Sequence, residues 1–183
     1  MTDCLRILSI DLYRFNQKRG LWNILWTAIR KKGFRHICYL RWYSNSRFHL
    51  LSRLLLRYST NRSGLDLSTS IGPGLVIHHP FNIAINGRTI IGANCTLYQG
   101  CVIGIEFRGK RAGAPILGNN VWVGSNAVIV GNIHIGNDVL IAPLSFVNFD
   151  VPDHSIVIGN PGLIISRENA TEKYIVNTID LLS

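Results

Sequence analysis

An aliphatic residue recurs at every sixth position over much of the chain beyond residue 64. The positions with this spacing fall in three runs: Leu65, Ile71 and Ile77; Ile91, Leu97 and Ile103; Leu117, Val123, Ile129, Ile135, Ile141 and Val147. A period of six is neither the 3.6 of an amphipathic helix nor the two of a half-buried strand. It is typical of a short strand plus a turn, three of which form a triangular coil. The pattern therefore predicts stacked parallel coils around one aliphatic column.

Two interruptions of this repeat predict departures from the regular coil. The spacing from Ile77 to Ile91 is 14 positions, which is two more than two repeats, and we expect residues 82–87 to bulge outward. Between Ile103 and Leu117 the polar residues 106–115 predict a loop that leaves the solenoid. Loops held by a rigid scaffold often carry function.

The regions on either side of the repeat follow a different pattern. Residues 1–63 predict two or three helices, broken near Gly20, Gly33 and residues 44–46. Residues 166–183 predict one short C-terminal helix. The sequence therefore predicts a mainly β protein with a helical segment at 1–63, a β-helix at 64–165 and a C-terminal helix at 166–183.

Charge separates the helical segment from the rest of the chain. The 183 residues are 47% hydrophobic and 16% charged, which excludes a disordered chain. The net charge is +9, but residues 1–63 hold 13 Lys/Arg and 2 acids, whereas residues 64–183 hold 6 Lys/Arg and 8 acids. Three Trp and several Leu lie among these basic residues, which fits contact with an anionic membrane surface. A helical cap packed on the β-helix is the alternative, and no recognition motif favours nucleic acid.

The cysteines and the N-terminal residues predict a cytoplasmic location. The four cysteines form no CxxC pair, so we expect them to be reduced. No secretory signal pattern is present, and the longest apolar stretch, residues 21–29, is shorter than the ~20 residues of a membrane span. We expect a cytoplasmic protein, with peripheral attachment to the inner face of the plasma membrane if the basic segment contacts lipid.

Four segments resemble one known family. They are Ile71-Gly-Pro-Gly-Leu-Val-Ile-His-His-Pro80, Ile91-Gly-Ala-Asn-Cys-Thr-Leu-Tyr-Gln-Gly100, Gly118-Asn-Asn-Val-Trp-Val-Gly124 and Val157-Ile-Gly-Asn-Pro161. They resemble the hexapeptide-repeat acyltransferases, in particular the serine acetyltransferase branch and its short relatives in bacterial polysaccharide gene clusters. The resemblance implies a left-handed parallel β-helix, a homotrimer, and acetyl-CoA as acyl donor, bound in clefts between neighbouring β-helices, with no metal.

His79 is the candidate general base. Transfer of an acetyl group to a hydroxyl needs a base for the hydroxyl proton, and a neutral imidazole suits that task near pH 7. We expect Ile77 and Phe81 to point inward, which directs His79 outward. Its place after the segment 71–77 matches that of the catalytic histidine in serine acetyltransferases. His134 and His154 are expected at the surface.

The chain departs from the serine acetyltransferase pattern around this histidine. Where those enzymes have an aspartate before the catalytic histidine, this chain has His78, and Gly113-Ala114 replaces their Arg-His pair. Their orienting aspartate aligns with Gly64. Asp66, two residues later on the same strand face, is the candidate to orient His79, with Asn82 or a backbone carbonyl as alternatives.

These departures remove side chains that would bind the ammonium and carboxylate groups of an amino acid, so they favour an acceptor that lacks both groups. The prediction is O-acetylation of a sugar hydroxyl in a bacterial surface polysaccharide or its lipid-linked precursor. The alternatives are a serine O-acetyltransferase and a trimeric scaffold without activity.

The resemblance also implies donor-binding residues. Small residues at coil corners would line the pantetheine, and cations of the polar loop would contact the phosphates; these are Gly104, Gly124, Ser125 and Pro143, and Arg108, Lys110 and Arg111. A backbone N–H near Gly104 would donate to the thioester oxygen as it gains charge.

Overall fold

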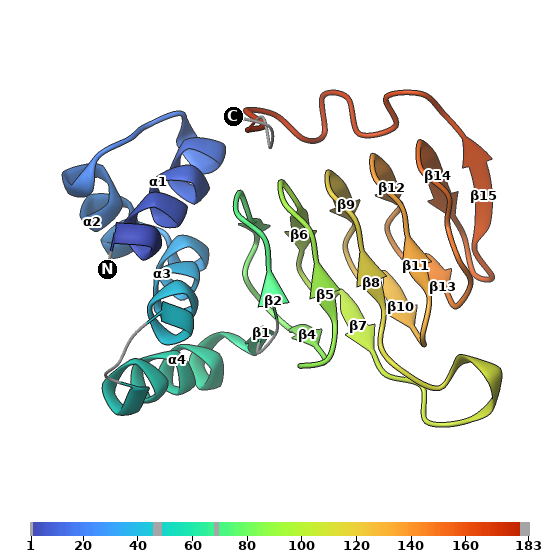
Figure 1. Ribbon diagram of the computed structural model, residues 1–183, viewed down its shortest axis with the longest axis horizontal. Coiled ribbons are helices and arrows are strands. Elements are labelled where there is room, and N and C mark those ends of the chain that lie inside the picture. The colour runs from blue at the N-terminus through green and yellow to red at the C-terminus, as the bar shows by residue number, and fades with distance from the viewer. Residues whose placement is uncertain (1, 46–48, 68–69, 180–183) are drawn as a thin grey trace.

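The computed structural model describes residues 2–45, 49–67 and 70–179 of the chain. It has a helical segment at one end and a parallel β-solenoid that makes up the rest, with the strands stacked in order along the long axis (Figure 1). The predicted fold class is confirmed.

Each of the first four coils of the solenoid contributes one strand to each of three sheets, which we name A, B and C, and the last coil adds strands to sheets A and C. Sheet A holds β1 (Leu65–Leu67), β4 (Ile83–Ile85), β7 (Val102–Gly104), β10 (Val128–Val130) and β13 (Phe146–Val147). Sheet B holds β2 (Ser70–Ile71), β5 (Ile90–Ile91), β8 (Ile116–Leu117) and β11 (His134–Ile135). Sheet C holds β3 (Val76–His78), β6 (Thr96–Tyr98), β9 (Val121–Val123), β12 (Val139–Ile141), β14 (Ser155–Ile158) and β15 (Leu163–Ser166). All pairings are parallel except that of β14 with β15, which closes the last coil.

The aliphatic column predicted from the repeat forms the core. All twelve residues of the six-residue spacing are buried, and their side chains belong to one continuous cluster. Cys95 and Cys101 fill small inward positions of this cluster, and burial raises the pKa of each thiol to about 12. Both are therefore inert at neutral pH. All four cysteines are unpaired.

Glycines at the corners allow the coils to stack closely. A Cβ added to Gly92 would lie 2.5 Å from the carbonyl oxygen of Gly118 in the next coil, and one added to Gly72 would lie 2.7 Å from the backbone nitrogen of Ala93. Neither glycine has a positive φ, so close approach of the backbones, and not the bend of the chain, requires glycine at these two positions.

We expect Gly92→Ala to lower the free energy of unfolding by about 1–3 kcal/mol, because the new methyl group overpacks a rigid backbone contact. Urea unfolding measures the change. Gly104→Ala is the matched control, since its Cβ would meet side-chain methyl groups and no backbone, the nearest being that of Val130 at 3.2 Å. Equal stability of Gly92→Ala and the wild type would contradict the close-stacking explanation.

The first interruption of the repeat lies elsewhere than predicted. Residues 83–85 form β4 in regular register with β1, so the outward bulge at residues 82–87 was wrong. The extra residues lie in the corner before β4. Six positions separate the inward residues Ile77 and Ile83, whereas four separate Leu97 from Cys101 in the next coil. The corner of residues 78–82 is therefore two residues longer than its neighbour, and Phe81, predicted to point inward, is 54% exposed.

The second interruption is the predicted loop. Residues 105–115 leave the solenoid between β7 and β8, on the lower right in Figure 1. A bridge pairs Glu106 with Gly113, and a short 3₁₀ helix, η1 (Gly109–Arg111), forms the tip.

The helical segment caps the first coil. It consists of α1 (Thr2–Asn16), α2 (Leu21–Arg30), α3 (Lys32–Asn45) and α4 (His49–Ser63). Leu12, Phe34 and Ile37 from the helices share one buried cluster with Leu65 and Leu75 of the first coil. The alternative of a helical cap packed on the β-helix is therefore confirmed. None of the helices within the described residues has the length and apolar character needed to span a lipid bilayer.

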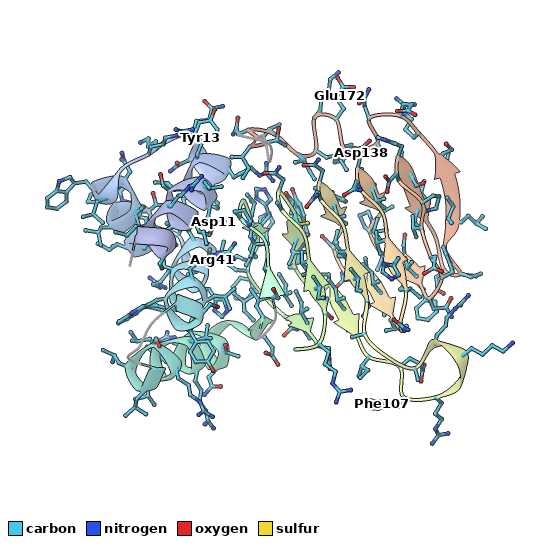
Figure 2. The ribbon with its side chains drawn as sticks, viewed as in Figure 1. Asp11, Tyr13, Arg41, Phe107, Asp138 and Glu172 are labelled. Carbon is cyan, nitrogen blue, oxygen red and sulfur yellow. The ribbon has the colours of Figure 1, made fainter. Side chains whose placement is uncertain are left out.

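A buried ion pair fixes this cap to the solenoid (Figure 2). Arg41 of α3 donates to Asp11 of α1 at 2.9 Å and 3.2 Å, and both side chains are almost fully buried. Asp11 also accepts the N–H groups of Gly74 and Leu75, while Arg41 donates to the carbonyl of Gly72 at 2.6 Å. Burial raises the pKa of Asp11, and these partners oppose that rise.

The predicted C-terminal helix does not form over the described residues 167–179, and residues 180–183 lie outside the described part. This segment instead runs in turns back along sheet C toward the helical cap (Figure 1). Several of its backbone groups form hydrogen bonds with side chains of the solenoid instead of the hydrogen bonds of a helix. Asp138 accepts the N–H groups of Ala170 and Thr171 at 3.0 Å, and Asn94 exchanges two hydrogen bonds with the backbone of Ile179.

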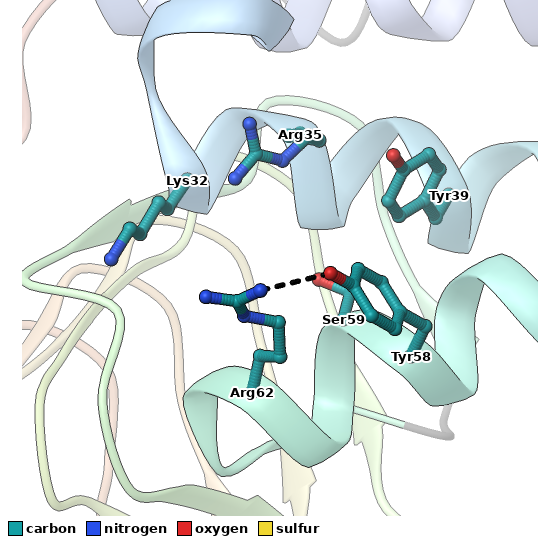
Figure 3. A pocket seen from close by; sticks show the side chains of 6 residues that line it. All are labelled: Lys32, Arg35, Tyr39, Tyr58, Ser59 and Arg62. Atoms are coloured by element: carbon teal, nitrogen blue, oxygen red, sulfur yellow. Dashed lines mark hydrogen bonds between the residues drawn. The ribbon is translucent and has the colours of Figure 1, made fainter.

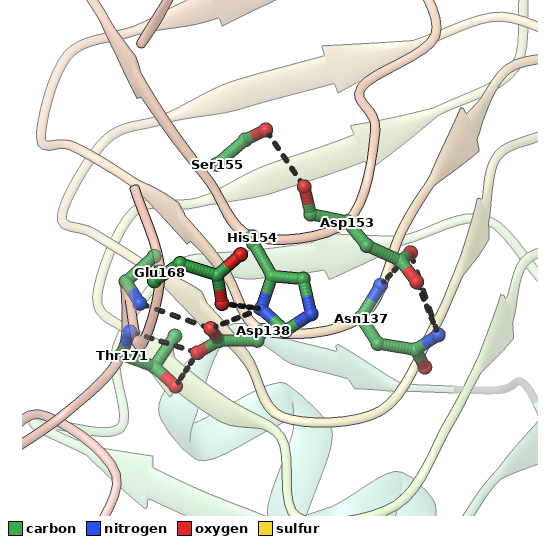
Figure 4. A network of polar contacts seen from close by, with 8 residues as sticks. Asn137, Asp138, Asp153, His154, Ser155, Glu168 and Thr171 are labelled. Carbon is green, nitrogen blue, oxygen red and sulfur yellow. Dashed lines mark hydrogen bonds and ion pairs between the residues drawn. The ribbon is translucent and has the colours of Figure 1, made fainter. Parts of the chain in front are cut away.

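Asp138 also joins this segment to the last coil (Figure 4). It accepts the Thr171 hydroxyl at 2.6 Å and contacts His154 Nδ1 at 2.9 Å. The hydrogen bond with Asp138 raises the pKa of His154. Both ends of the C-terminal segment are thus tied to the solenoid, which explains why it lies along sheet C.

Candidate active site

His79 lies in the lengthened corner between β3 and β4 and is exposed, as predicted. Its φ is 49°, in the left-handed region that non-glycine residues adopt rarely, and its carbonyl accepts the N–H of Phe81 at 2.8 Å. Such backbone geometry is often found where a side chain must be held in a functional orientation. The corner therefore presents His79 to solvent on a tightly turned backbone, beside the exposed His78 at the end of β3.

Aromatic side chains form a row on sheet C beside this imidazole. The centroid of the Tyr98 ring lies 6.3 Å from the ring centroid of His79 and 5.0 Å from that of His78. On its other side Tyr98 packs against Trp122, with 5.0 Å between the ring centroids. Tyr174 of the C-terminal segment continues the row at 5.2 Å from Trp122. Burial, followed by the charges of His79 and Arg14, lowers the pKa of His78.

The sequence reasoning missed Tyr98 and Trp122, although the repeat held the signal for Tyr98. It follows an inward residue by one position, as His78 does, and the two are register partners in adjacent strands. Trp122 precedes an inward residue, and its register partner in the adjacent strand is Thr96. Its contact with Tyr98 therefore runs diagonally between the strands, which is harder to predict from the repeat.

Asn82 occupies the space beside Gly64. A Cβ added to Gly64 would lie 2.9 Å from Asn82 Oδ1, so the amide oxygen of Asn82 lies where a side chain at position 64 would project. Asp66 lies on β1 with an exposed side chain. Burial lowers the pKa of the buried His36 to about 4, and the charge of Asp66 opposes this shift. The structure thus relates Asp66 to His36, and its role toward His79 stays a prediction.

Some of the expected donor residues share an edge of the solenoid with His79. All strands of sheet A are parallel, so the corners that lead from sheet C into sheet A lie along one edge, which we name the C–A edge. Gly124, Ser125 and Pro143 lie in later corners of this same edge. The coils stack tightly there, since Ser125 accepts the N–H of Leu144 at 3.0 Å.

The other expected donor residues lie on the opposite edge of sheet A. Gly104 ends β7, and the exposed Arg108, Lys110 and Arg111 follow it in the loop, which carries the exposed Phe107 (Figure 2). Arg111 donates to the carbonyl of Asn148. Within one chain the width of sheet A therefore separates these cations from His79.

The described residues hold no group of three His, Cys, Asp or Glu side chains placed to bind a metal ion.

Comparison of the sequence with known proteins identifies the family of this chain. The model of the bacterial transferase hexapeptide family matches residues 114–148. Serine acetyltransferase from Helicobacter pylori (strain ATCC 700392 / 26695) is 34% identical over 126 residues, which are 67% of this chain and 72% of that protein. The chain belongs to the hexapeptide-repeat transferases. The resemblance inferred from residues 71–161 is thereby confirmed.

Other members of the hexapeptide-repeat transferases show how far the likeness extends. Serine acetyltransferase from Synechococcus elongatus is 37% identical over 130 residues, 69% of this chain but only 52% of that protein. The chain therefore spans about half the length of this relative. The crystal structure of Neisseria gonorrhoeae serine acetyltransferase covers 98% of this chain and 72% of that one, with a TM-score of 0.75 at 24% identity. The structure of a serine acetyltransferase in complex with CoA covers 89% of this chain and 68% of that one, with a TM-score of 0.69 at 25% identity.

Proposed function

We propose that the protein is an acetyl-CoA-dependent O-acetyltransferase in which His79 is the general base. The exposed imidazole in the lengthened corner carries this proposal, together with relatives that are serine acetyltransferases. His79 takes the proton of the acceptor hydroxyl while the hydroxyl oxygen attacks the thioester carbonyl. The C–O bond forms, the C–S bond breaks, and the proton passes to the sulfur of CoA as it leaves.

Asn82 is the strongest candidate to position His79, because its amide oxygen lies beside Gly64, where the serine acetyltransferase pattern has a carboxylate. Asp66 is the second candidate. An amide oxygen can accept the N–H of the ring and so fix the tautomer that leaves the other nitrogen free to act as a base.

Serine is the first acceptor to test, because the named relatives are serine acetyltransferases. A sugar hydroxyl is the second. It is favoured by His78 before the base and by Gly113-Ala114 before Pro115, which offer no charges to an amino acid. Incubation of the protein and acetyl-CoA with serine or with a sugar panel, followed by measurement of thiol release, separates the two. Release at the background rate with every acceptor would contradict the proposal and favour an inactive scaffold.

The active assembly is proposed to be a homotrimer. The loop cations and His79 lie on opposite edges of sheet A, so a neighbouring copy has to bring its loop edge against the C–A edge to complete a site. Light scattering after gel filtration is expected to give three times the chain mass of 20.5 kDa. A monomer that is active at the same dilution would contradict the shared site.

The double variant Arg108→Ala/Lys110→Ala is expected to raise the KM for acetyl-CoA about tenfold and leave kcat nearly unchanged, because lost charged contacts to phosphate weaken binding without touching the reacting atoms. Steady-state kinetics measure both constants. The exposed Arg167, on the C-terminal side of the solenoid, supplies the control Arg167→Ala. An unchanged KM in the double variant would remove the loop from the donor site.

A further inference from the structure

A polar cavity of about 420 Å³ lies in the helical cap between α3 and α4 (Figure 3). Lys32, Arg35, Tyr39, Tyr58, Ser59 and Arg62 line it. Its size suits a phosphate or diphosphate group with part of the molecule attached to it.

The charged side chains that line this cavity are all basic. Lys32, Arg35 and Arg62 line it without any acidic side chain, and within the described residues none of the three forms an ion pair. Arg62 donates to the Tyr58 hydroxyl at 2.9 Å, and Arg35 donates to the carbonyl of Ile29 at 3.2 Å. Both acceptors are neutral, so neither hydrogen bond compensates the charge of its arginine. Converging cations repel each other until an anion binds, and Arg and Lys are well suited to phosphate oxygens.

The cavity adjoins the corner that holds His79. Lys32 Nζ lies 5.8 Å from the ring centroid of Phe81, two residues after His79. The next residue, Gly33, packs directly on the same corner, since an added Cβ would lie 3.0 Å from the carbonyl oxygen of Ile77 and 3.5 Å from Pro80 Cβ. A ligand with a phosphate in the cavity can therefore extend past Lys32 toward His79.

We propose that this cavity binds a phosphate or diphosphate group of the acceptor, so that the acceptor is a sugar linked to phosphate whose free hydroxyl reaches His79. This proposal rests on the proposed O-acetyl transfer, and it favours a sugar over serine as the acceptor of the acetyl group. The phosphate comes either from a soluble sugar nucleotide or from the headgroup of a lipid-linked sugar.

Calorimetric titration with inorganic pyrophosphate tests the cavity independently of catalysis. The wild type is expected to bind pyrophosphate, and Arg35→Gln/Arg62→Gln to weaken binding at least about tenfold. Arg53→Gln/Arg57→Gln is the matched control, because it removes two exposed arginines of α4 that do not line the cavity. No binding by the wild type, or the same loss in the control, would overturn the proposal.

Two further measurements separate the acceptor role from the proposed function. UDP-N-acetylglucosamine and phosphatidylcholine vesicles with polyprenyl phosphate show which source of phosphate binds, and Arg35→Gln/Arg62→Gln is expected to weaken the one that does. His79→Asn is expected to keep pyrophosphate binding and lose acetyl transfer. Pyrophosphate binding by a wild type that transfers no acetyl group would refute the proposed function and leave the cavity assigned. Weaker binding of acetyl-CoA in Arg35→Gln/Arg62→Gln would overturn the acceptor role.

The outer face of α2 carries a second inference. This helix buries Ile24 and Thr27, while its large apolar side chains face solvent. The exposed fractions are 56% for Leu21, 84% for Trp22, 48% for Leu25, 56% for Trp26 and 69% for Ile29. Positions i, i+1, i+4, i+5 and i+8 lie on one side of a helix, so these five form a single apolar face.

The charges around this face identify its partner. Residues 17–35 contain six Lys/Arg and no acid. Two copies of such a face would repel each other, whereas anionic lipid headgroups attract it at about 1 kcal/mol per basic residue near the surface. Trp and Leu beside Lys and Arg are the composition of helices that lie in a membrane interface. We infer that α2 binds the surface of an anionic membrane.

Co-sedimentation with vesicles tests this inference. Binding is expected to phosphatidylcholine vesicles with 30% phosphatidylglycerol, taken as roughly the anionic content of a bacterial membrane, and not to phosphatidylcholine alone. It should be lost in Trp22→Ser/Trp26→Ser and kept in Leu163→Ser/Ile165→Ser, which removes exposed apolar residues from β15 at the other end of the solenoid (Figure 1). Equal binding by both variants, no binding by the wild type, or a changed oligomeric state in Trp22→Ser/Trp26→Ser would overturn it.

Discussion

Replacement of His79 by asparagine is expected to lower kcat by about 10²–10⁴, because the acceptor hydroxyl then has no base to take its proton. Asparagine tolerates the left-handed backbone that His79 adopts, with φ of 49°, so the fold and the assembly should be kept. Thiol release from acetyl-CoA in the presence of the active acceptor measures the loss.

The control for this variant is His134→Ala. His134 is exposed on β11 of sheet B, away from the C–A edge, and its removal should leave kcat within about twofold of the wild type. If His79→Asn keeps wild-type kcat while folded and assembled, His79 is not the base, and another group would have to supply the proton transfer.

Replacement of Arg41 by alanine is expected to lower the free energy of unfolding by roughly 3–5 kcal/mol, which is the largest stability effect that the structure implies. The variant leaves the buried carboxylate of Asp11 without its cation and removes the donor to the carbonyl of Gly72. Urea unfolding followed by circular dichroism measures the change.

Two further variants test this explanation. Arg57→Ala removes an exposed arginine of α4 and should change stability by less than about 0.5 kcal/mol. Asp11→Ala/Arg41→Ala removes both charges of the pair and should recover part of the loss, because no carboxylate is then buried without its cation. A loss below about 1 kcal/mol for Arg41→Ala would show that the ion pair does not hold the cap on the solenoid.

The repeat was sufficient to predict the solenoid, because a spacing of six fixes both the inward residue and the corner of each coil. It could not place the two extra residues after Ile77. Ile83 and Ile85 both point inward in β4, and the sequence alone does not show which of them continues the earlier register. The sequence analysis had assigned the two extra residues to positions 82–87. The structure places them in the corner that holds His79.

Long-range contacts explain the elements that the sequence predicted less well. The break between helices expected near Gly33 is confirmed, because α2 ends at Arg30 and α3 begins at Lys32. The C-terminal segment lacks a helix over residues 167–179 because Asn94 and Asp138, far away in sequence, bind its backbone. No local pattern reveals such partners.

The site was predictable in part for the same reason. The exposure of His79 was predicted, although Phe81, whose inward position was part of the reasoning, is itself exposed. The place of Asn82 beside Gly64 depends on two adjacent coils. The separation of His79 from Arg108 and Lys110 by the width of sheet A follows only from the topology.

Transfer of a labelled acetyl group from acetyl-CoA to an acceptor hydroxyl, compared between the wild type and His79→Asn, tests the central claim most directly. We predict a labelled ester on a sugar or on serine that forms with the wild type and is reduced by at least about 10² in the variant. Equal rates of label transfer in the two proteins, or the absence of a labelled ester with any acceptor, would contradict it.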